Sequence, residues 1–266
     1  MDNNDDLFGG AGSDMLPANL TAGIANIYRH TKKVMWTLVQ YKDMQMKYSC
    51  AIKEIKTKFD VLSTEFNVKH KRNPISSISS RLKSTESIVN KLMRKDLPFS
   101  IEGMENNLFD IAGVRVVCSY IDDIYAIADA LLAQDDIELV ERKDYIKQPK
   151  PNGYRSLHLI VRVPVFFAGS KENVPVEVQI RTIAMDFWAS LEHKIAYKFE
   201  GKAPDYLERE LKSCADMVDM LDMKMFSLNQ AIMAVEEEER RREEEKRRER
   251  EKAERKQEEL AGNGPT

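Results

Sequence analysis

Cysteine is scarce in this 266-residue chain, and its three cysteines form no recognisable pattern. Cys50, Cys118 and Cys214 lie far apart, are odd in number and include no Cys-x-x-Cys pair. Disulfide frameworks need paired cysteines and structural zinc sites need closely spaced ones, so the sequence predicts neither. Unpaired cysteines fit a reducing compartment, and we expect a cytoplasmic protein.

Long hydrophobic runs and a large excess of one charge are also missing. No apolar run reaches the roughly 18 to 20 residues of a membrane span. The N-terminus is acidic and glycine-rich, whereas a signal peptide begins with basic residues followed by an apolar core. We therefore expect no membrane partner. The formal net charge of -3 excludes a globally basic nucleic-acid-binding protein, although local basic clusters can still bind phosphates.

Composition divides the chain into four parts. Residues 1–17 show no apolar periodicity and are predicted to form a disordered leader. Residues 18–235 are predicted to form one folded domain with flanking helices, because 42% hydrophobic residues can supply one ordinary core in a chain of this length. Residues 236–260 are predicted to form a charged helical tail, and residues 261–266 a disordered end.

Apolar residues at spacings of three, four and seven predict amphipathic helices over about 20–41 and 46–66, and a further amphipathic stretch over 81–95. Another apolar stripe runs from Leu207 to Ile232. It needs a partner surface, either on the same domain or on another subunit.

The charged tail is almost purely Glu, Arg and Lys, with oppositely charged residues four apart. Such pairs support a helix, and the absence of an apolar face predicts a solvated one. A solubilising tail is the simpler interpretation. RNA contact is the weaker alternative, because acidic residues slightly outnumber basic ones and would repel phosphates.

Short β-branched segments alternate with helical ones in the middle of the chain. Strands are predicted over 114–120, 137–146, 156–165 and 174–181, and helices over 122–134 and from the last strand to about 198. We expect the α+β class, with a mixed β-sheet of about five strands flanked by helices, and helical N- and C-terminal extensions.

Three of these strands carry polar residues on one face. In 174–181, Val176, Val178 and Ile180 alternate with Glu177, Gln179 and Arg181. His158, Ile160 and Arg162 alternate with apolar residues in the preceding strand, and Arg115 does so in 114–120. Any half-exposed sheet alternates in this way. Three strands together, however, predict one polar surface holding a carboxylate, an amide, an imidazole and guanidinium groups.

Two carboxylates and a set of cations surround this predicted surface. Asp110 precedes one strand and Glu177 lies on another, so the pair could hold Mg²⁺ together with substrate phosphates. Arg81 and Lys83 lead into the stretch that carries Ser87 and Lys91, and this cluster could bind a triphosphate or be merely solvated. Tyr154 could stack on a purine or simply pack over its turn.

Five motifs resemble the synthetase domain of the RelA/SpoT homologue family, in particular small alarmone synthetases without a hydrolase. They are Arg81-Leu-Lys83-Ser84-Thr-Glu-Ser87, Asp110-Ile-Ala-Gly-Val-Arg115-Val, Asp144-Tyr-Ile-Lys-Gln-Pro-Lys150-Pro-Asn-Gly-Tyr154-Arg-Ser-Leu-His158, Val176-Glu177-Val-Gln179-Ile-Arg181-Thr and Phe187-Trp188-Ala-Ser-Leu-Glu192-His193-Lys-Ile-Ala-Tyr197-Lys198. Their order and spacing span about residues 46–232.

The resemblance implies a nucleotidyltransferase-like fold and a (p)ppGpp synthetase, which moves pyrophosphate from ATP to the 3′-hydroxyl of GDP or GTP and releases AMP. It implies ATP binding by Arg81, Lys83, Ser87, Lys91 and Arg115, with the two arginines enclosing the adenine. It implies Mg²⁺ as cofactor, held by Asp110 and Glu177, with Glu177 alternatively the general base. Acceptor binding is implied for Lys143, Lys150, Asn152, Tyr154, His158 and Gln179.

The resemblance further implies a homo-oligomer, by family a tetramer, with an allosteric alarmone site between subunits. Two departures bear on the acceptor: Lys143 stands where some relatives carry Arg, and Asp186 where some carry Asn near the guanine. Toxic members of the family instead pyrophosphorylate tRNA ends or make adenosine alarmones, and the motifs barely discriminate them. A silent RNA-binding protein is the remaining alternative, which the intact carboxylates disfavour.

Overall fold

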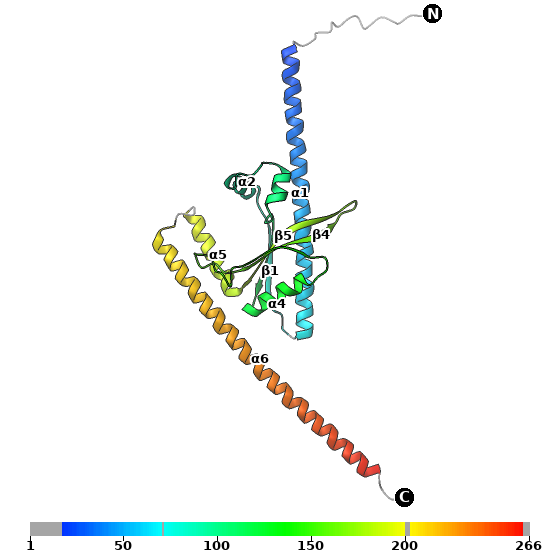
Figure 1. Ribbon diagram of the computed structural model, residues 1–266. Coiled ribbons are helices and arrows are strands. Elements are labelled where there is room, and N and C mark those ends of the chain that lie inside the picture. The colour runs from blue at the N-terminus through cyan, green and yellow to red at the C-terminus, as the bar shows by residue number, and fades with distance from the viewer. Residues whose placement is uncertain (1–17, 71, 200–202, 263–266) are drawn as a thin grey trace, which may run out of the picture.

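The computed structural model describes residues 18–70, 72–199 and 203–262 (Figure 1). The predicted leader over 1–17 and residues 263–266 lie outside the described residues. The elements follow one another as α1 (Ala18–His70), β1 (Ile75–Leu82), α2 (Thr85–Arg94), α3 (Ile101–Asn107), β2 (Ala112–Cys118), α4 (Ile121–Leu132), β3 (Glu138–Asp144), β4 (Leu157–Phe166), β5 (Lys171–Thr182), α5 (Ile183–Lys198) and α6 (Asp205–Gly262).

The centre of the molecule is a five-stranded mixed sheet with the order β1-β2-β5-β4-β3. Strands β2 and β5 are parallel, and the other neighbouring pairs are antiparallel. The predicted mixed sheet of about five strands flanked by helices is therefore confirmed. Each of the four strands predicted from the sequence is present, with ends that differ by one to three residues.

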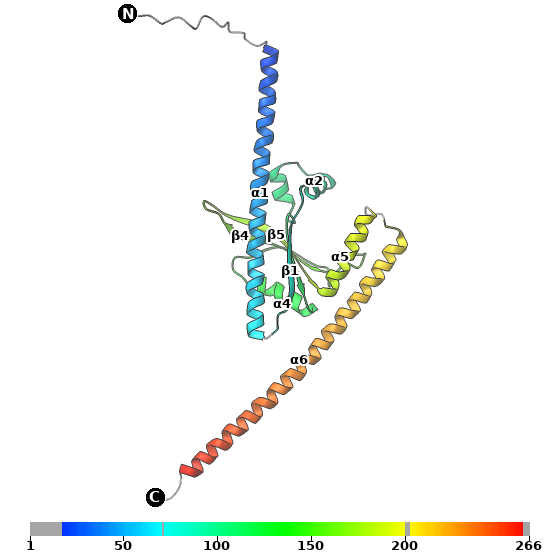
Figure 2. The same ribbon diagram turned by 180° about the vertical axis from the view of Figure 1, so that it is seen from behind.

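Alternation along the strands decides which face is covered. In β5 the apolar residues Val176, Val178 and Ile180 are fully buried. They belong to one large core together with residues of α1 and α4, which include Ile55, Phe59 and Ile127. Helix α1 packs against β1, β2, β4 and β5. Helices α5 and α6 lie on the side of the sheet opposite to α1 (Figures 1 and 2). The polar strand residues face this side of the sheet.

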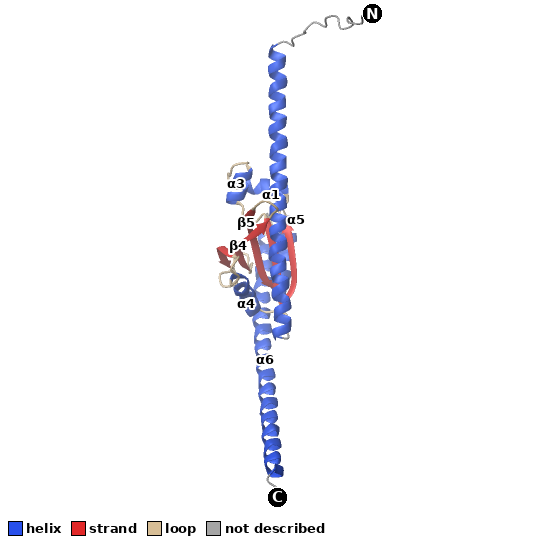
Figure 3. Cartoon of the chain, turned by 90° about the vertical axis from the view of Figure 1, so that its right-hand side faces the viewer, coloured by secondary structure: helices blue, strands red, loops and turns tan. Residues whose placement is uncertain are grey.

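The two terminal helices are longer than predicted. One helix replaces the two expected over 20–41 and 46–66, because the connecting residues 42–45 contain neither glycine nor proline to interrupt it. Helix α6 runs without a break from the predicted apolar stripe through the predicted charged tail and ends at Gly262, so residues 261 and 262 are helical rather than disordered. Both helices extend well beyond the sheet, in opposite directions (Figure 3).

Strand β1 was not predicted. The apolar residues Ile75, Ile78 and Leu82 stand at spacings of three and four, which resemble a helix, and the other residues are mostly serines. A register shift between Ile75 and Ser77 explains the irregular spacing, and an edge strand needs only one neighbour. Arg81 therefore lies at the end of a strand, and Arg81 and Lys83 lead into the helix that carries Ser87 and Lys91, as predicted, because that helix begins at Thr85. Helix α3 was also missed.

The three cysteines, Cys50, Cys118 and Cys214, are free thiols. Among the described residues, no helix is long and apolar enough to cross a membrane.

Candidate active site

The strand register aligns polar residues in two rows across the sheet. One row crosses all five strands and consists of Ser79, Arg115, Gln179, His158 and Lys143, each opposite the next. The adjacent row places Arg81 opposite Gly113, and Gly113 opposite Glu177. Directly paired residues project to the same face, so the single polar surface predicted from three separate strands is confirmed.

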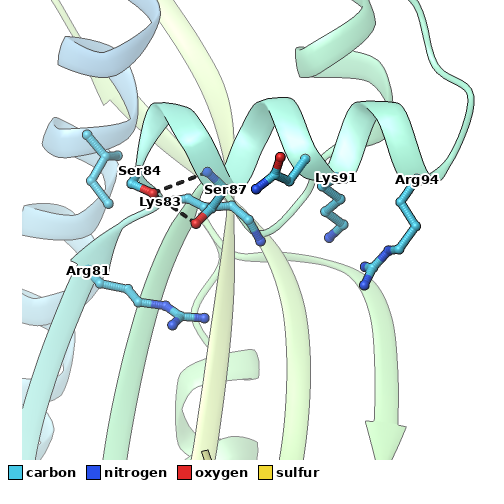
Figure 4. A pocket seen from close by; sticks show the side chains of 8 residues that line it. Arg81, Lys83, Ser84, Ser87, Lys91 and Arg94 are labelled. Atoms are coloured by element: carbon cyan, nitrogen blue, oxygen red, sulfur yellow. Dashed lines mark hydrogen bonds between the residues drawn. The ribbon is translucent and has the colours of Figure 1, made fainter. Parts of the chain in front are cut away.

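A cavity of about 480 Å³ lies between β1 and α2 (Figure 4). Its lining includes all four of the predicted residues from this part of the chain; the full set is Arg81, Leu82, Lys83, Ser84, Ser87, Asn90, Lys91 and Arg94. Ser84 caps α2 by accepting a hydrogen bond from the Ser87 backbone N–H at 3.2 Å. A helix N-terminus and several cations facing one hollow form a site suited to phosphates.

Asp110 lies between two of these lysines. Its Oδ2 is 2.6 Å from the Lys83 Nζ and 2.6 Å from the Lys91 Nζ. Burial by itself would raise the pKa of Asp110, but the hydrogen bonds and charges of the two lysines outweigh it, and the pKa is lowered. The carboxylate is therefore ionised at neutral pH. Its other oxygen, Oδ1, is buried and has no hydrogen-bond partner in the protein.

A second cavity, of about 200 Å³, continues from Arg81 over the centre of the sheet. Arg81, Arg115, Glu177 and Gln179 line it together with parts of β1 and β2. Burial and the nearby Arg181 lower the pKa of Arg115 from its usual value, although an arginine remains charged at physiological pH. The two arginines predicted to enclose one base thus border the same cavity from neighbouring strands.

Glu177 belongs to a closed ring of hydrogen bonds. Its Oε1 is 3.2 Å from the His158 Nδ1, and the His158 Nε2 is 2.8 Å from the Tyr154 hydroxyl. The Arg181 Nη2 donates to that hydroxyl at 2.6 Å and to the Gln179 Oε1 at 2.7 Å. The Gln179 Nε2 closes the ring by donating to the Glu177 Oε2 at 2.9 Å. Four predicted site residues are therefore held as one unit.

The environment of Glu177 keeps it ionised. Burial would raise its pKa and the charge of Asp110 adds to this, but the hydrogen bonds from His158 and Gln179 outweigh them, so the pKa is lowered. Burial also raises the pKa of Tyr154, which keeps its hydroxyl protonated. The hydrogen-bond ring thus holds the Glu177 carboxylate near the aromatic side chain of Tyr154.

The remaining predicted acceptor residues lie around this ring without joining it. The Lys150 ammonium lies 4.7 Å from the centroids of both the Tyr145 and Tyr154 rings. The Lys143 Nζ pairs with Glu141 at 2.7 Å and is about half exposed. The Asn152 side chain accepts from the Tyr154 backbone N–H at 3.1 Å and donates to the Glu192 Oε1 at 3.3 Å, so it shapes the turn rather than facing the sheet.

Two residues outside the predicted set complete the site. Arg181 is 4% exposed and holds both Tyr154 and Gln179. Asp186 places its Oδ1 3.2 Å from both the Arg115 Nη1 and the Arg181 Nη1, and so supplies the negative charge between two close guanidinium groups. The alternation of β5 had placed Arg181 on the polar face, but it gave no sign that the side chain bridges its neighbours.

The carboxylates suit a hard cation only if substrate oxygens complete its shell. The described residues contain no cluster of three or more His, Cys, Asp or Glu that could hold a metal ion. Asp110 and Glu177 interact electrostatically, and the Asp110 Oδ1 is free of protein partners. Mg²⁺ is commonly held by one or two carboxylates together with substrate phosphates, so the residues present fit such an ion.

The chain matches known proteins over most of its length. A family model described as a region found in RelA / SpoT proteins matches residues 80–202. The GTP pyrophosphokinase YwaC of Bacillus subtilis is 46% identical over 203 residues, which cover 76% of this chain and 97% of that protein. The chain belongs to the RelA/SpoT family. A second B. subtilis relative, the GTP pyrophosphokinase YjbM, is 36% identical over 70% of this chain and 87% of its own length.

Solved structures of RelA/SpoT members share the fold. The small alarmone synthetase 2 of B. subtilis is 48% identical over 72% of this chain and 98% of its own, with a TM-score of 0.66. The small alarmone synthetase 1 of B. subtilis, bound to its product pppGpp, is 34% identical over 73% of this chain and 98% of its own, with a TM-score of 0.68. About a quarter of this RelA/SpoT chain falls outside each match.

Proposed function

We propose that this protein is a (p)ppGpp synthetase, which transfers the pyrophosphoryl group of ATP to the 3′-hydroxyl of GDP or GTP and releases AMP. The observation that carries the proposal is the position of Glu177, which lies between the arginine-lined cavity and the aromatic side chain of Tyr154. The membership of the RelA/SpoT family and the activity named for YwaC, at 46% identity, support the same reaction.

ATP binds on the side of β1 and α2. The adenine lies between Arg81 and Arg115, whose planar guanidinium groups stack well on a base. The phosphates extend into the larger cavity toward Lys83, Ser87 and Lys91. The two lysines share one carboxylate, Asp110, which holds both ammonium groups close together and pre-orients them for a polyphosphate.

Mg²⁺ is the proposed cofactor, with Asp110 and Glu177 as its protein ligands. When bound, it would neutralise charge on the phosphates during the transfer. The unpartnered Asp110 Oδ1 is the oxygen that we assign to the ion. Lys83 and Lys91 then hold the second oxygen of the same carboxylate and fix its orientation.

The acceptor nucleotide binds on the side of Tyr154. Its guanine stacks on the Tyr154 ring, a contact worth about 1–3 kcal/mol for bases in general. Lys143, Lys150, His158 and Gln179 border its ribose and phosphates, and Asn152 contributes to the acceptor side by shaping the turn that carries Tyr154. Lys150 rests over two aromatic rings, and an arriving base that takes this place would move the ammonium toward the phosphates.

Glu177 is the proposed acceptor of the proton from the 3′-hydroxyl. His158 and Gln179 hold its two oxygens from opposite ends, so the carboxylate has a fixed orientation and stays ionised. Positioning of the two nucleotides and compensation of charge supply most of the rate enhancement in phosphoryl transfer. Lys83 and Lys91, beside Asp110, compensate the charge of the phosphates.

A homo-oligomer, a tetramer by family resemblance, remains part of the proposal, as does an allosteric alarmone site between subunits. Support comes from exposed apolar side chains on the projecting helices, which include Trp36 and Leu38 on α1 and Met220 and Leu228 on α6. The predicted cytoplasmic location is supported by the three free thiols. For the charged tail we propose a solubilising role, and RNA contact remains the weaker alternative.

Product analysis tests the function directly. Purified protein would be incubated with labelled ATP, with or without Mg²⁺, and with GDP, GTP, deacylated tRNA or no acceptor. We expect a labelled guanosine tetra- or pentaphosphate that requires Mg²⁺. The Glu177→Gln variant should be inactive, whereas Glu172→Gln, which removes the same charge from the exposed end of β5, should be active. Label in tRNA or in an adenosine product would assign the protein to the toxic branch.

A further inference from the structure

The loop over 147–155, between β3 and β4, carries three residues that the proposed function assigns to the acceptor: Lys150, Asn152 and Tyr154. Its shape is set locally. The Gly153 backbone N–H donates to the Lys150 carbonyl at 2.8 Å, and the Tyr154 N–H donates to the Asn152 Oδ1 at 3.1 Å. Such bonds fix the turn but not its position above the sheet, so support must come from another element.

Helix α6 lies directly under this loop. Ala215 is 2% exposed, and a Cβ added at Gly153 would come within 2.4 Å of the Ala215 Cβ and 3.1 Å of the Lys212 Cδ. Gly153 also has a φ of 89°, in the region that favours glycine. Both its backbone conformation and the lack of space therefore require glycine, because the turn rests on the helix without a gap.

An ion pair holds the loop on the helix one turn further on. The Arg155 Nη2 lies 3.0 Å from the Asp219 Oδ2, and the Arg155 side chain is only 13% exposed. Partial burial makes such a pair stronger than one in open solvent. The neighbouring Tyr154 packs against a small apolar cluster that includes Trp188, Ala215 and Val218. The loop thus contacts α6 on both sides of Tyr154.

Helix α6 is itself fixed to the sheet and to α5, so it can hold the loop in a defined position. The Thr182 Oγ1, at the end of β5, donates to the Asp222 Oδ2 at 2.6 Å, and both residues are buried. The Trp188 Nε1 donates to the Leu211 carbonyl at 2.9 Å. These two anchors lie on either side of Ala215 and Asp219 in the sequence, which prevents the helix from shifting along the loop.

We propose that the first five turns of α6 form the support of the acceptor subsite, and that Asp219 is a positioning residue for GDP or GTP that acts through Arg155. This inference rests on the proposed function. The residues assigned to ATP come instead from β1, α2, the connection between them and β2, so the support serves one substrate and not the other. That asymmetry makes the role measurable.

Steady-state kinetics of three variants test it. In Asp219→Asn we expect the KM for GDP to rise roughly fivefold, the effect of losing one partly shielded ion pair, while kcat and the KM for ATP change less than about twofold. Asp219→Glu keeps the carboxylate and should restore most of the affinity for GDP. Glu210→Gln removes an equal charge from the opposite face of the same helix and should match the wild type.

Hydrogen exchange of the free protein gives a readout that does not depend on activity. The backbone amides of residues 148–155 should exchange faster in Asp219→Asn than in the wild type or in Glu210→Gln. Equal effects of Asp219→Asn and Glu210→Gln in both experiments would overturn the inference, and so would an equal rise of both KM values. If the wild type makes no guanosine product, the proposed function fails, whereas the exchange of the loop still decides whether α6 positions it.

Discussion

Replacement of Glu177 by glutamine tests whether the hydrogen-bond ring is built around a carboxylate. In the folded protein, the two Glu177 oxygens accept from His158 and Gln179, and the side chain is 16% exposed. Glutamine has a single acceptor oxygen, so one of these donors would face an NH₂ group. Hydrogen bonds to charged groups contribute about 1.5–3 kcal/mol each, and the burial of the charge opposes them. We expect Glu177→Gln to lose about 1–2 kcal/mol of unfolding free energy at pH 7.

The pH dependence of this loss of unfolding free energy tests the argument more stringently than its size at pH 7. The pKa of Glu177 in the folded protein lies below its ordinary value of 4.5, so the unfolded chain binds the proton more readily. The stabilisation by Glu177 is therefore fully present above about pH 4.5 and is lost as the pH falls through the folded pKa. Glutamine does not titrate. The difference in stability between wild type and variant should shrink toward low pH.

Urea denaturation at a series of pH values from neutral to about 3, which extends below the ordinary pKa of a glutamate, measures this difference. The fluorescence of Trp188, which is buried next to Tyr154, reports on the region. Glu172→Gln is the matched control, because Glu172 lies on the same strand and forms a more exposed pair with Lys47. A difference for Glu177→Gln that stays constant, or that grows as the pH falls, would refute the argument that the ring stabilises an ionised carboxylate.

Three further predictions concern the nucleotides and the tail. Asp110→Asn leaves Lys83 and Lys91 without their shared counter-charge and removes a proposed metal ligand; initial rates should fall by about a hundredfold or more and should not recover in a Mg²⁺ titration. Tyr154→Ala should weaken GDP binding by roughly tenfold or more in calorimetry, while Tyr154→Phe keeps the stacking ring and should bind far better. Removal of residues 236–266, whose described side chains are exposed, should change kcat less than about twofold in the product assay.

The strands that pack one apolar face on the core were the easiest part of the fold to predict. Val176, Val178 and Ile180 alternate strictly because one face of β5 meets the core. Strand β1 was not predicted, because it is an edge strand with a register shift and its few apolar residues have helical spacing. The split of α1 into two helices was wrong, because residues 42–45 contain no helix breaker. In α6 the predicted apolar stripe and the predicted charged helical tail form one continuous helix.

From the sequence, we could predict which face of each strand carries the residues of the candidate site, but not the contacts between them. Periodicity placed Glu177 and Gln179 on one side of β5, and the register across β2 and β4 then brought Arg115 and His158 beside them. Contacts that depend on side-chain direction could not be foreseen. Asp186 is an example, since it lies in the first turn of α5 and reaches two arginines on different strands. Strand periodicity carries no information about such a helical residue.

The closed ring through Glu177, His158, Tyr154, Arg181 and Gln179 constrains how the sequence of this enzyme can drift. Each member satisfies two others, so a single substitution leaves an unmatched donor or acceptor in a partly buried setting. Substitutions within the ring should therefore be epistatic, with the effect of one depending on the residue present at the next. A change of acceptor nucleotide that required a different ring would have to pass through poorly folded or poorly active intermediates, which favours the persistence of the whole set.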